Sequence, residues 1–262
     1  MSKGKLSAKT FLNNINNNKF DDLSDLKDLS TISLDDPRLI NKTFNIEDLT
    51  LNESKNNIEQ YQELKIILET ASACQISDAV NAVTGESGVI KGLKSINNQR
   101  AYGRAVTSKA SSKDWGASLL AIDAAKEGDF LLLYTTGEPA AVWGELASTC
   151  AKEKGIVGTA VYGATRDIDV LLHLDYPVFA LETLPNAGKP SGIGELNVNL
   201  QIENYLISPG DFIYADESGV VIVQKSIFSK VILETLKIKI NESKIINQLK
   251  AGKSLSTVVG LR

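Results

Sequence analysis

Three apolar runs constrain the fold of this chain more than any other sequence feature. They read DFLLLYTT (residues 129–136), IVGTAVYG (156–163) and PVFALE (177–182). Between the first two lies GELASTCAKEKG (144–155), which is typical of a helix that a final glycine closes. Strands that alternate with helices predict an α/β fold, in which a parallel or mixed sheet packs against its helices.

The segment before these runs extends the alternation. QRAYGRAVTSKAS (99–111) reads as a strand. The next stretch places Trp115, Leu119 and Ile122 on one face of a predicted helix. Gly128 is expected to end that helix as the glycine that follows its last turn.

The pattern after residue 190 is rich in strands. LNVNLQI (196–202) alternates apolar and polar residues, which predicts one half-buried strand. SPGDFIYADESGVVIV (208–223) predicts two strands joined by a tight turn, with Asp216 and Glu217 as turn residues. A helical run from about residue 226 to 250 follows.

Residues 1–55 differ in composition from the rest of the chain. They are rich in Asn, Asp, Ser and Lys and poor in Ala, Gly and Val. This predicts an N-terminal extension, either partly disordered or formed of short docking helices, and one folded domain over residues 56–262.

Charge and composition exclude several classes of function. A formal net charge of −4 argues against a nucleic-acid binder. The one histidine, His173, leaves no histidine cluster for zinc. Cys74 and Cys150 are expected to be buried reduced thiols of a cytoplasmic protein. No apolar run approaches the length of a membrane span, and no signal peptide is expected.

A cluster of charged residues follows the predicted strands. Gly144 and Glu145 open a helix, where free backbone N–H groups attract an anion, and Arg166 and Asp167 follow a buried strand directly. Ligands of open α/β sheets bind at the carboxyl ends of strands, so these side chains are expected to share a pocket if the strands are neighbours. The alternative is a salt-bridged surface loop and a glutamate that only complements the helix dipole.

Such a pocket would suit one kind of chemistry. Carboxylates that retain water ligands suit Mg²⁺ or Mn²⁺, and an adjacent arginine can hold an oxyanion. A helix N-terminus can hold a carboxylate. Together these groups would bind a 2-oxo acid and stabilise its enolate, as the cleavage of a C–C bond next to a ketone requires.

The segment GELASTCAKEKGIVGTAVYGATRDID (144–169) resembles the signature of the RraA-like family. That family includes the 4-hydroxy-4-methyl-2-oxoglutarate/4-carboxy-4-hydroxy-2-oxoadipate aldolases and the regulator of ribonuclease activity A. Further similar segments are ISDAV, GRAVTSKA, EGDFLLL, YPVFALETLP, GELNVNLQI, SPGDFIYADESGVVIV and LKAGKSLSTVVGLR. The resemblance covers about residues 60 to 262 and implies a layered, swivelling β/β/α-type domain with mixed sheets.

The resemblance also implies roles for individual residues. Asp167 matches the aspartate that ligates the metal directly, and Arg166 matches the arginine that binds the keto oxygen and stabilises the enolate. Gly144, Leu146 and Ala147 match the backbone that receives the substrate carboxylate.

Two glutamates complete the implied site. Glu145 stands where the family has an aspartate that holds a metal-bound water and so moves the proton. The change keeps the charge but adds a methylene. Glu242 matches a glutamate that a neighbouring subunit contributes, also through water, so the resemblance implies a homotrimer or homohexamer.

Two functions remain open from the sequence. The first is a lyase dependent on Mg²⁺ or Mn²⁺ that cleaves 4-hydroxy-4-methyl-2-oxoglutarate-type substrates in a retro-aldol reaction, decarboxylates oxaloacetate, or both. The second is a non-catalytic protein that binds a ribonuclease or another partner. An intact set of Glu145, Arg166, Asp167 and Glu242 favours the lyase.

Overall fold

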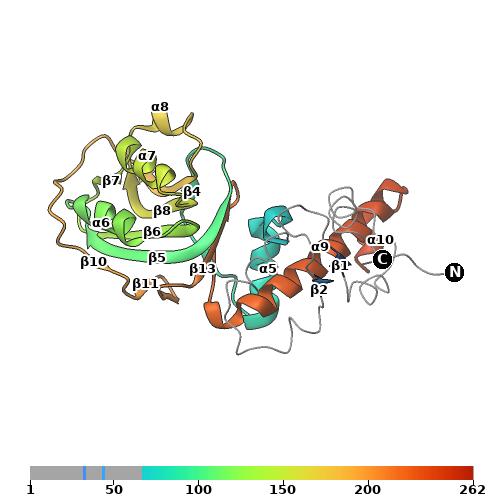
Figure 1. Cartoon of the computed structure of the whole chain (residues 1–262). Coiled ribbons are helices and arrows are strands. Elements are labelled where there is room, and N and C mark those ends of the chain that lie inside the picture. The colour runs from blue at the N-terminus through green and yellow to red at the C-terminus, as the bar shows by residue number, and fades with distance from the viewer. Residues whose placement is uncertain (1–31, 34–42, 45–66, 262) are drawn as a thin grey trace. The chain divides into compact units, whose positions relative to one another are not determined.

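The computed structural model describes residues 32–33, 43–44 and 67–261 (Figure 1). They fall into two compact units, one formed by Ser72–Phe228 and the other by the segments before and after it. No helix in this part of the chain is long and apolar enough to cross a membrane.

The unit formed by Ser72–Phe228 contains a large sheet, a hairpin and several helices. The strands of the sheet are β3 (Val89–Ile90), β4 (Lys94–Ser95), β5 (Ala101–Ser111), β6 (Asp129–Thr136), β7 (Ala141–Trp143), β8 (Gly158–Thr165), β9 (Val178–Thr183), β10 (Glu195–Leu196), β13 (Phe212–Asp216) and β14 (Gly219–Val223). The hairpin is β11 (Leu200–Ile202) with β12 (Tyr205–Ile207). The helices are α5 (Ala73–Thr84), α6 (Gly116–Ala124), α7 (Glu145–Glu153), α8 (Ile168–Leu171) and the 3₁₀ helix η1 (Lys225–Ile227).

The large sheet is mixed. Its order is β3-β14-β13-β5-β6-β8-β9-β4, with β10 beside β5 and β7 beside β8. The central strands β5, β6, β8 and β9 run parallel, and the outer strands pair antiparallel. The alternation of strands and helices in the sequence predicted this α/β arrangement, and the structure confirms it.

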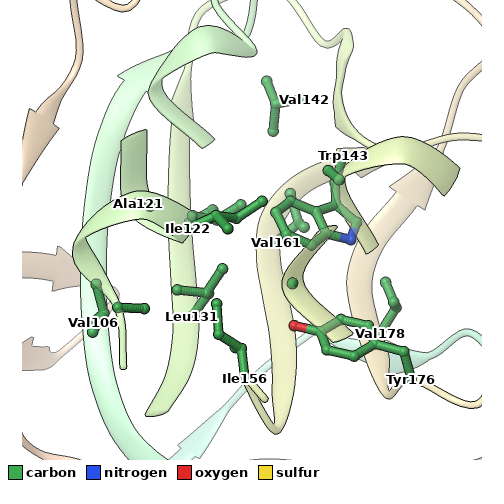
Figure 2. Close-up of a cluster of buried hydrophobic side chains, with 14 of the residues drawn as sticks. Val106, Ala121, Ile122, Leu131, Val142, Trp143, Ile156, Val161, Tyr176 and Val178 are labelled. Atoms are coloured by element: carbon green, nitrogen blue, oxygen red, sulfur yellow. The ribbon is translucent and has the colours of Figure 1, made fainter. Parts of the chain in front are cut away.

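The central strands are buried on both faces. On one face of β6, Leu131 and Leu133 join a cluster with residues of α6 and α7, and Figure 2 shows Leu131 among these side chains. On the other face, Phe130 and Leu132 pack with residues of β11 and β12. Hairpin, sheet and helices therefore form three layers, which explains why β6 reads as an unbroken apolar run.

A capping box and a buried aspartate fix the start of α5. The Ser72 side chain accepts from the Gln75 backbone N–H, and the Gln75 side chain accepts from the Ser72 N–H. The buried Asp216 carboxylate accepts from the Ala73 N–H at 2.7 Å and from the Ser218 N–H at 2.8 Å. Asp216 therefore forms its turn as predicted and also holds α5 against the sheet.

Two predicted boundaries are wrong. Helix α6 ends at Ala124, because the buried Ala125 is already extended, and Gly128 lies in the turn before β6 with a φ of 84°. The single strand predicted over residues 196–202 is two, because Asn197 takes a φ of 51° between β10 and β11. These short strands pair with different partners, β5 and β12.

The prediction of buried cysteines is also wrong. Cys74 on α5 and Cys150 on α7 are free and exposed. Their neighbours Ala73 and Ala151 face the core instead, at 3% and 0% exposure. A small apolar neighbour does not fix which face of a helix a cysteine occupies.

The second unit holds the C-terminal helices α9 (Phe228–Lys250) and α10 (Leu255–Val258), and the short strands β1 (Ile32–Ser33) and β2 (Thr43–Phe44), which pair antiparallel. The predicted helix from about residue 226 thus begins at Phe228. Apart from these two strands, the predicted N-terminal extension and its boundary at residues 55/56 lie outside the described residues.

Candidate functional site

The end of β8 lies against the start of α7. Strand β7 runs parallel to β8, and its last residue pairs with Thr165. The Trp143 carbonyl accepts from the Arg166 N–H at 3.0 Å and from the Thr165 hydroxyl at 3.2 Å. The Trp143 indole N–H donates to the Ser148 hydroxyl at 2.7 Å and so fixes the first turn of α7. Residues far apart in sequence thereby share one edge of the sheet.

Asp167 lies at the N-terminus of α7. Its Oδ2 accepts from the Glu145 backbone N–H at 3.0 Å. Gly144 allows this approach, because a Cβ there would collide with that oxygen and lie 3.1 Å from Arg166 Cγ. The carboxylate therefore occupies the position where a helix attracts an anion.

Arg166 and Asp167 form a half-exposed pair. The Arg166 Nε lies 3.5 Å from Asp167 Oδ2. Asp167 itself has φ 58° and ψ 43°, a left-handed conformation that costs free energy in a residue other than glycine. Its carbonyl accepts from the N–H groups of Val170 and Leu171, so this strained residue also begins α8.

A shallow pocket of about 120 Å³ opens beside this pair. Its lining comes from α6, β7, the start of α7, the end of β8 and one further residue, and consists of Trp115, Leu119, Ala141, Val142, Trp143, Gly144, Leu146, Ala147, Arg166, Asp167 and Ala187. Apart from the charged Arg166 and Asp167, the side chains of this lining are apolar.

The structure brings together five of the seven predicted site residues. Gly144, Leu146, Ala147, Arg166 and Asp167 all line the pocket.

The two glutamates behave differently. The exposed Glu145 does not line the pocket and contributes its backbone N–H to Asp167. Glu242 lies half-buried on α9, in the other compact unit, so its role in a neighbour's site stays a prediction.

The oxygen donors beside the pocket fit one kind of metal ion. Among the described residues, no three His, Cys, Asp or Glu side chains converge as a metal cage. Asp167 offers one fixed carboxylate. The backbone N–H of Glu145 donates to that carboxylate, so Glu145 is its neighbour in space. A set of so few oxygen donors fits a hard cation such as Mg²⁺, because Mg²⁺ keeps several water ligands. It does not fit zinc, which takes three or four ligands from the protein, mostly nitrogen and sulfur.

Asp114 is a structural residue of the site that the sequence reasoning missed. Its Oδ1 accepts from the N–H groups of Gly116 at 2.9 Å and Gly192 at 2.8 Å, and its Oδ2 from Ile193 at 2.7 Å. Burial acts to raise the pKa of this carboxyl, but these backbone hydrogen bonds outweigh it and lower the pKa. An acid two residues before the start of α6 was the only available sequence signal, and it did not identify the loop.

The same loop closes over α6 through two further contacts. The Trp115 indole N–H donates to the Gly188 carbonyl at 3.1 Å, and the Trp115 backbone N–H donates to the Lys189 carbonyl. Gly188 is required here, because a Cβ would overlap the Lys113 backbone. Ala187 is thereby held at the pocket.

Comparisons with known proteins identify a family and several relatives. The model of the family described as RraA-like, Aldolase/RraA, matches residues 73–222. An uncharacterized protein of Methanocaldococcus jannaschii is 38% identical over 177 residues, which are 66% of this chain and 85% of that protein. A candidate 4-hydroxy-4-methyl-2-oxoglutarate aldolase of Halalkalibacterium halodurans is 36% identical over 151 residues, 57% of this chain and 71% of that protein. The crystal structure of an uncharacterized protein from Pseudomonas syringae pv. tomato has a TM-score of 0.67 at 26% identity, and the match covers 75% of this chain and 96% of that one.

Proposed function

Because the chain belongs to the RraA-like family, we propose that it is a divalent-metal-dependent lyase that acts on 2-oxo acids. The name of the Halalkalibacterium halodurans relative supports an aldolase. One observation carries the proposal most directly: a carboxylate, a guanidinium and a helix N-terminus meet at one small pocket. These are the groups that a 2-oxo acid and its enolate require.

The substrate binds through two features of the chain. The N–H groups of Leu146 and Ala147 lie in the first turn of α7, where a helix leaves its N–H groups without partners inside the helix, and they receive the substrate carboxylate. The Arg166 guanidinium donates to the 2-oxo oxygen. Asp167, with Glu145 beside it, would hold the cation, which when bound polarises the same 2-oxo oxygen.

In the retro-aldol reaction, a 4-hydroxy-2-oxo acid loses the proton of its C4 hydroxyl to the Glu145 carboxylate through a water. The C4–O bond becomes a carbonyl, the C3–C4 bond breaks, and its electron pair moves into the enolate of pyruvate. Arg166 stabilises the negative charge that develops on the enolate oxygen. The proton then returns to C3, so pyruvate and an aldehyde or ketone leave. Decarboxylation of oxaloacetate would pass through the same enolate, with CO₂ as the leaving group.

The proposal is tested with pyruvate-release kinetics and Mn²⁺ titration calorimetry on the full chain. The Asp167→Ala variant should lose measurable Mn²⁺ binding, because a hard cation held mostly by waters depends on its one fixed carboxylate. The Arg166→Ala variant should retain metal binding and lose roughly 10² to 10³ in turnover, as when one donor to a developing oxyanion is removed.

Two conservative variants serve as controls. Arg166→Lys should recover little activity, because an ammonium lacks the planar fork of the guanidinium. Glu145→Asp should keep or raise activity if Glu145 acts only through water. Unchanged Mn²⁺ affinity in a folded Asp167→Ala protein would refute the metal site and leave the protein-binding alternative.

A further inference from the structure

Trp143 contacts both elements that supply the candidate site. Its carbonyl accepts from the Arg166 N–H at 3.0 Å and from the Thr165 hydroxyl at 3.2 Å, so its backbone is tied to the end of β8. Its indole N–H donates at 2.7 Å to the hydroxyl of Ser148, in the first turn of α7. One residue therefore connects the strand end that precedes Arg166 with a helix start whose N–H groups lack partners inside the helix.

The side chains of this connection are buried. Trp143 is 2% exposed, and Ser148 and Thr165 are both 0% exposed. The indole ring packs in the core cluster, and Figure 2 shows it there. A buried polar group that loses its partner is strongly destabilising, because water does not replace the lost hydrogen bond. The bond from the indole to Ser148 therefore resists small displacements of the helix start.

The start of α7 also lies close to the Arg166 side chain. The Ser148 N–H donates to the Gly144 carbonyl at 3.0 Å, the first hydrogen bond of α7, so the residue that holds the indole is itself fixed in the helix. A Cβ on Gly144 would lie 3.1 Å from Arg166 Cγ. A movement of the helix start therefore changes the distance from its N–H groups to the guanidinium.

That distance is important for a 2-oxo acid. The carboxylate and the 2-oxo oxygen are on adjacent carbon atoms, so the groups that receive them must keep one spacing. In the proposed function these groups are the N–H groups of Leu146 and Ala147 and the Arg166 guanidinium. A misplacement of about 1 Å between such groups lowers a rate about 10²-fold.

We propose that Trp143 is a positioning residue, which through Ser148 sets the spacing between the carboxylate site on α7 and Arg166 after β8. This proposal rests on the proposed function and deepens it, because it identifies the contact that lets one ligand use both groups at once. The alternative is that the hydrogen bond only satisfies a buried indole N–H and stabilises the fold.

Two acids of equal length and charge separate these roles. Pyruvate can use both groups, whereas propanoate lacks the 2-oxo oxygen and can use only the carboxylate site. Calorimetry on the full chain in the presence of Mg²⁺ measures the affinity for each acid. The wild type should bind pyruvate at least about tenfold more tightly than propanoate, because a site that hydrogen-bonds an oxygen disfavours the analogue without it.

The Ser148→Ala variant removes the hydroxyl that holds the indole. It should lower the affinity for pyruvate about tenfold and the affinity for propanoate less than about twofold, because both groups remain but their spacing is no longer fixed. Trp143→Phe, which removes the donor instead of the acceptor, should reproduce this selective loss. Equal losses for the two acids, or no loss for either, would overturn the proposal.

Thr159→Val is the matched control. The hydroxyls of Thr159 and Tyr176 share a buried hydrogen bond, also of 2.7 Å, and Tyr176 belongs to the same core cluster as Trp143. Thr159 is near the start of β8 and does not line the pocket. This variant should lower Tm about as much as Ser148→Ala and keep the affinity ratio of the wild type. A change of the ratio as large as that in Ser148→Ala would show that general destabilisation, and not spacing, weakens pyruvate binding.

The outcomes separate this proposal from the proposed function. If Ser148→Ala shows the selective loss but no 4-hydroxy-2-oxo acid releases pyruvate, the lyase proposal fails and the positioning role stands. If the wild type releases pyruvate but Ser148→Ala and Thr159→Val behave alike, the lyase stands and the positioning role fails. A wild type that binds no pyruvate would overturn the positioning role, whatever the lyase assay shows.

Discussion

At the scale of single residues, Asp167 combines two side-chain contacts with an unusual backbone conformation. It accepts from the N-terminus of α7, lies 3.5 Å from the Arg166 Nε and starts α8 with a left-handed backbone. Strained backbone at a ligand-binding edge persists only where the surroundings over-determine it. Here the surroundings include Gly144, whose missing side chain leaves room for the carboxylate.

The Gly144→Ala variant should therefore damage the site but not the fold. The backbone of Gly144 is extended, so alanine can adopt it, but the new methyl would displace the Asp167 carboxylate from the Glu145 N–H. We expect kcat/KM to fall by about 10²-fold, the loss typical of a ~1 Å misplacement, with weaker Mn²⁺ binding and a nearly unchanged Tm.

Gly128→Ala is the opposite control. A Cβ at Gly128 meets nothing within 4 Å, but its φ of 84° is unfavourable for alanine. This variant should lose about 1–2 kcal/mol of stability and keep its kcat/KM. If Gly144→Ala lowered Tm and left activity intact, the close approach of Asp167 would have no functional role.

At the scale of elements, the loop over α6 decides the shape of the pocket. Backbone N–H groups on both sides of this contact, at Gly116, Gly192 and Ile193, converge on one buried carboxylate. Each such bond to an ionised group is stronger than a neutral one. Asp114 therefore reinforces the contact between a helix start and a glycine-rich loop, which also meet through one parallel β-bridge between Asp114 and Lys189.

The stability that Asp114 contributes should depend on pH. Its folded-state pKa is below the ordinary 3.8, so its contribution is fully present above about pH 4 and is lost as the pH falls through the lower folded value. Asp114→Asn should reduce the free energy of unfolding by roughly 1.5–3 kcal/mol at pH 7, because a hydrogen bond to a charged acceptor is lost. The difference from wild type should shrink in acid.

Urea unfolding between pH 2 and pH 7 measures this, with the exposed Asp123→Asn on α6 as control. A pH-independent difference for Asp114→Asn would mean that the carboxylate charge is not the stabilising feature.

At the scale of the whole molecule, large apolar side chains stay exposed beside the site. Leu146, at the start of α7, is 79% exposed, and Ile193, in the pinned loop, is 85% exposed. Large apolar side chains that are this exposed are of the kind that a protein interface covers. The predicted trimer or hexamer, in which Glu242 of one chain reaches the site of the next, remains a proposal that this surface supports.

Ile193→Asp should move the assembly toward monomers. The Ile193 side chain is largely exposed and makes little contact within the chain, so the variant should fold. At an interface, however, the new carboxylate would be buried without a partner, which strongly disfavours association. Light scattering at micromolar concentration should show the wild type as a trimer or hexamer and the variant smaller, with reduced activity. Leu206→Asp, at a 53% exposed position on β12, is the control and should not change the mass. A monomeric wild type would remove Glu242 from the site.

The sequence by itself determined the elements and most of the site. Apolar runs of six to eight residues between turn and helix signals are typical of central strands, so β6, β8 and β9 were predicted to within about two residues. Local residue pairs also marked two element ends: Gly144 and Glu145 the start of α7, and Arg166 and Asp167 the end of β8. Arg166 and Asp167 line one pocket as expected, since ends of parallel strands lie at one edge, whereas Glu145, which was expected to share it, does not line it.

Only the tertiary structure decided features that depend on contacts distant in sequence. The Glu145 backbone, and not its side chain, contacts Asp167, and Asp114 binds a loop nearly eighty residues away. The break of the predicted strand at Asn197 arises because its two halves pair with different strands. Local patterns report which residues prefer burial, whereas the partner of each hydrogen-bonding group depends on where the whole chain brings it.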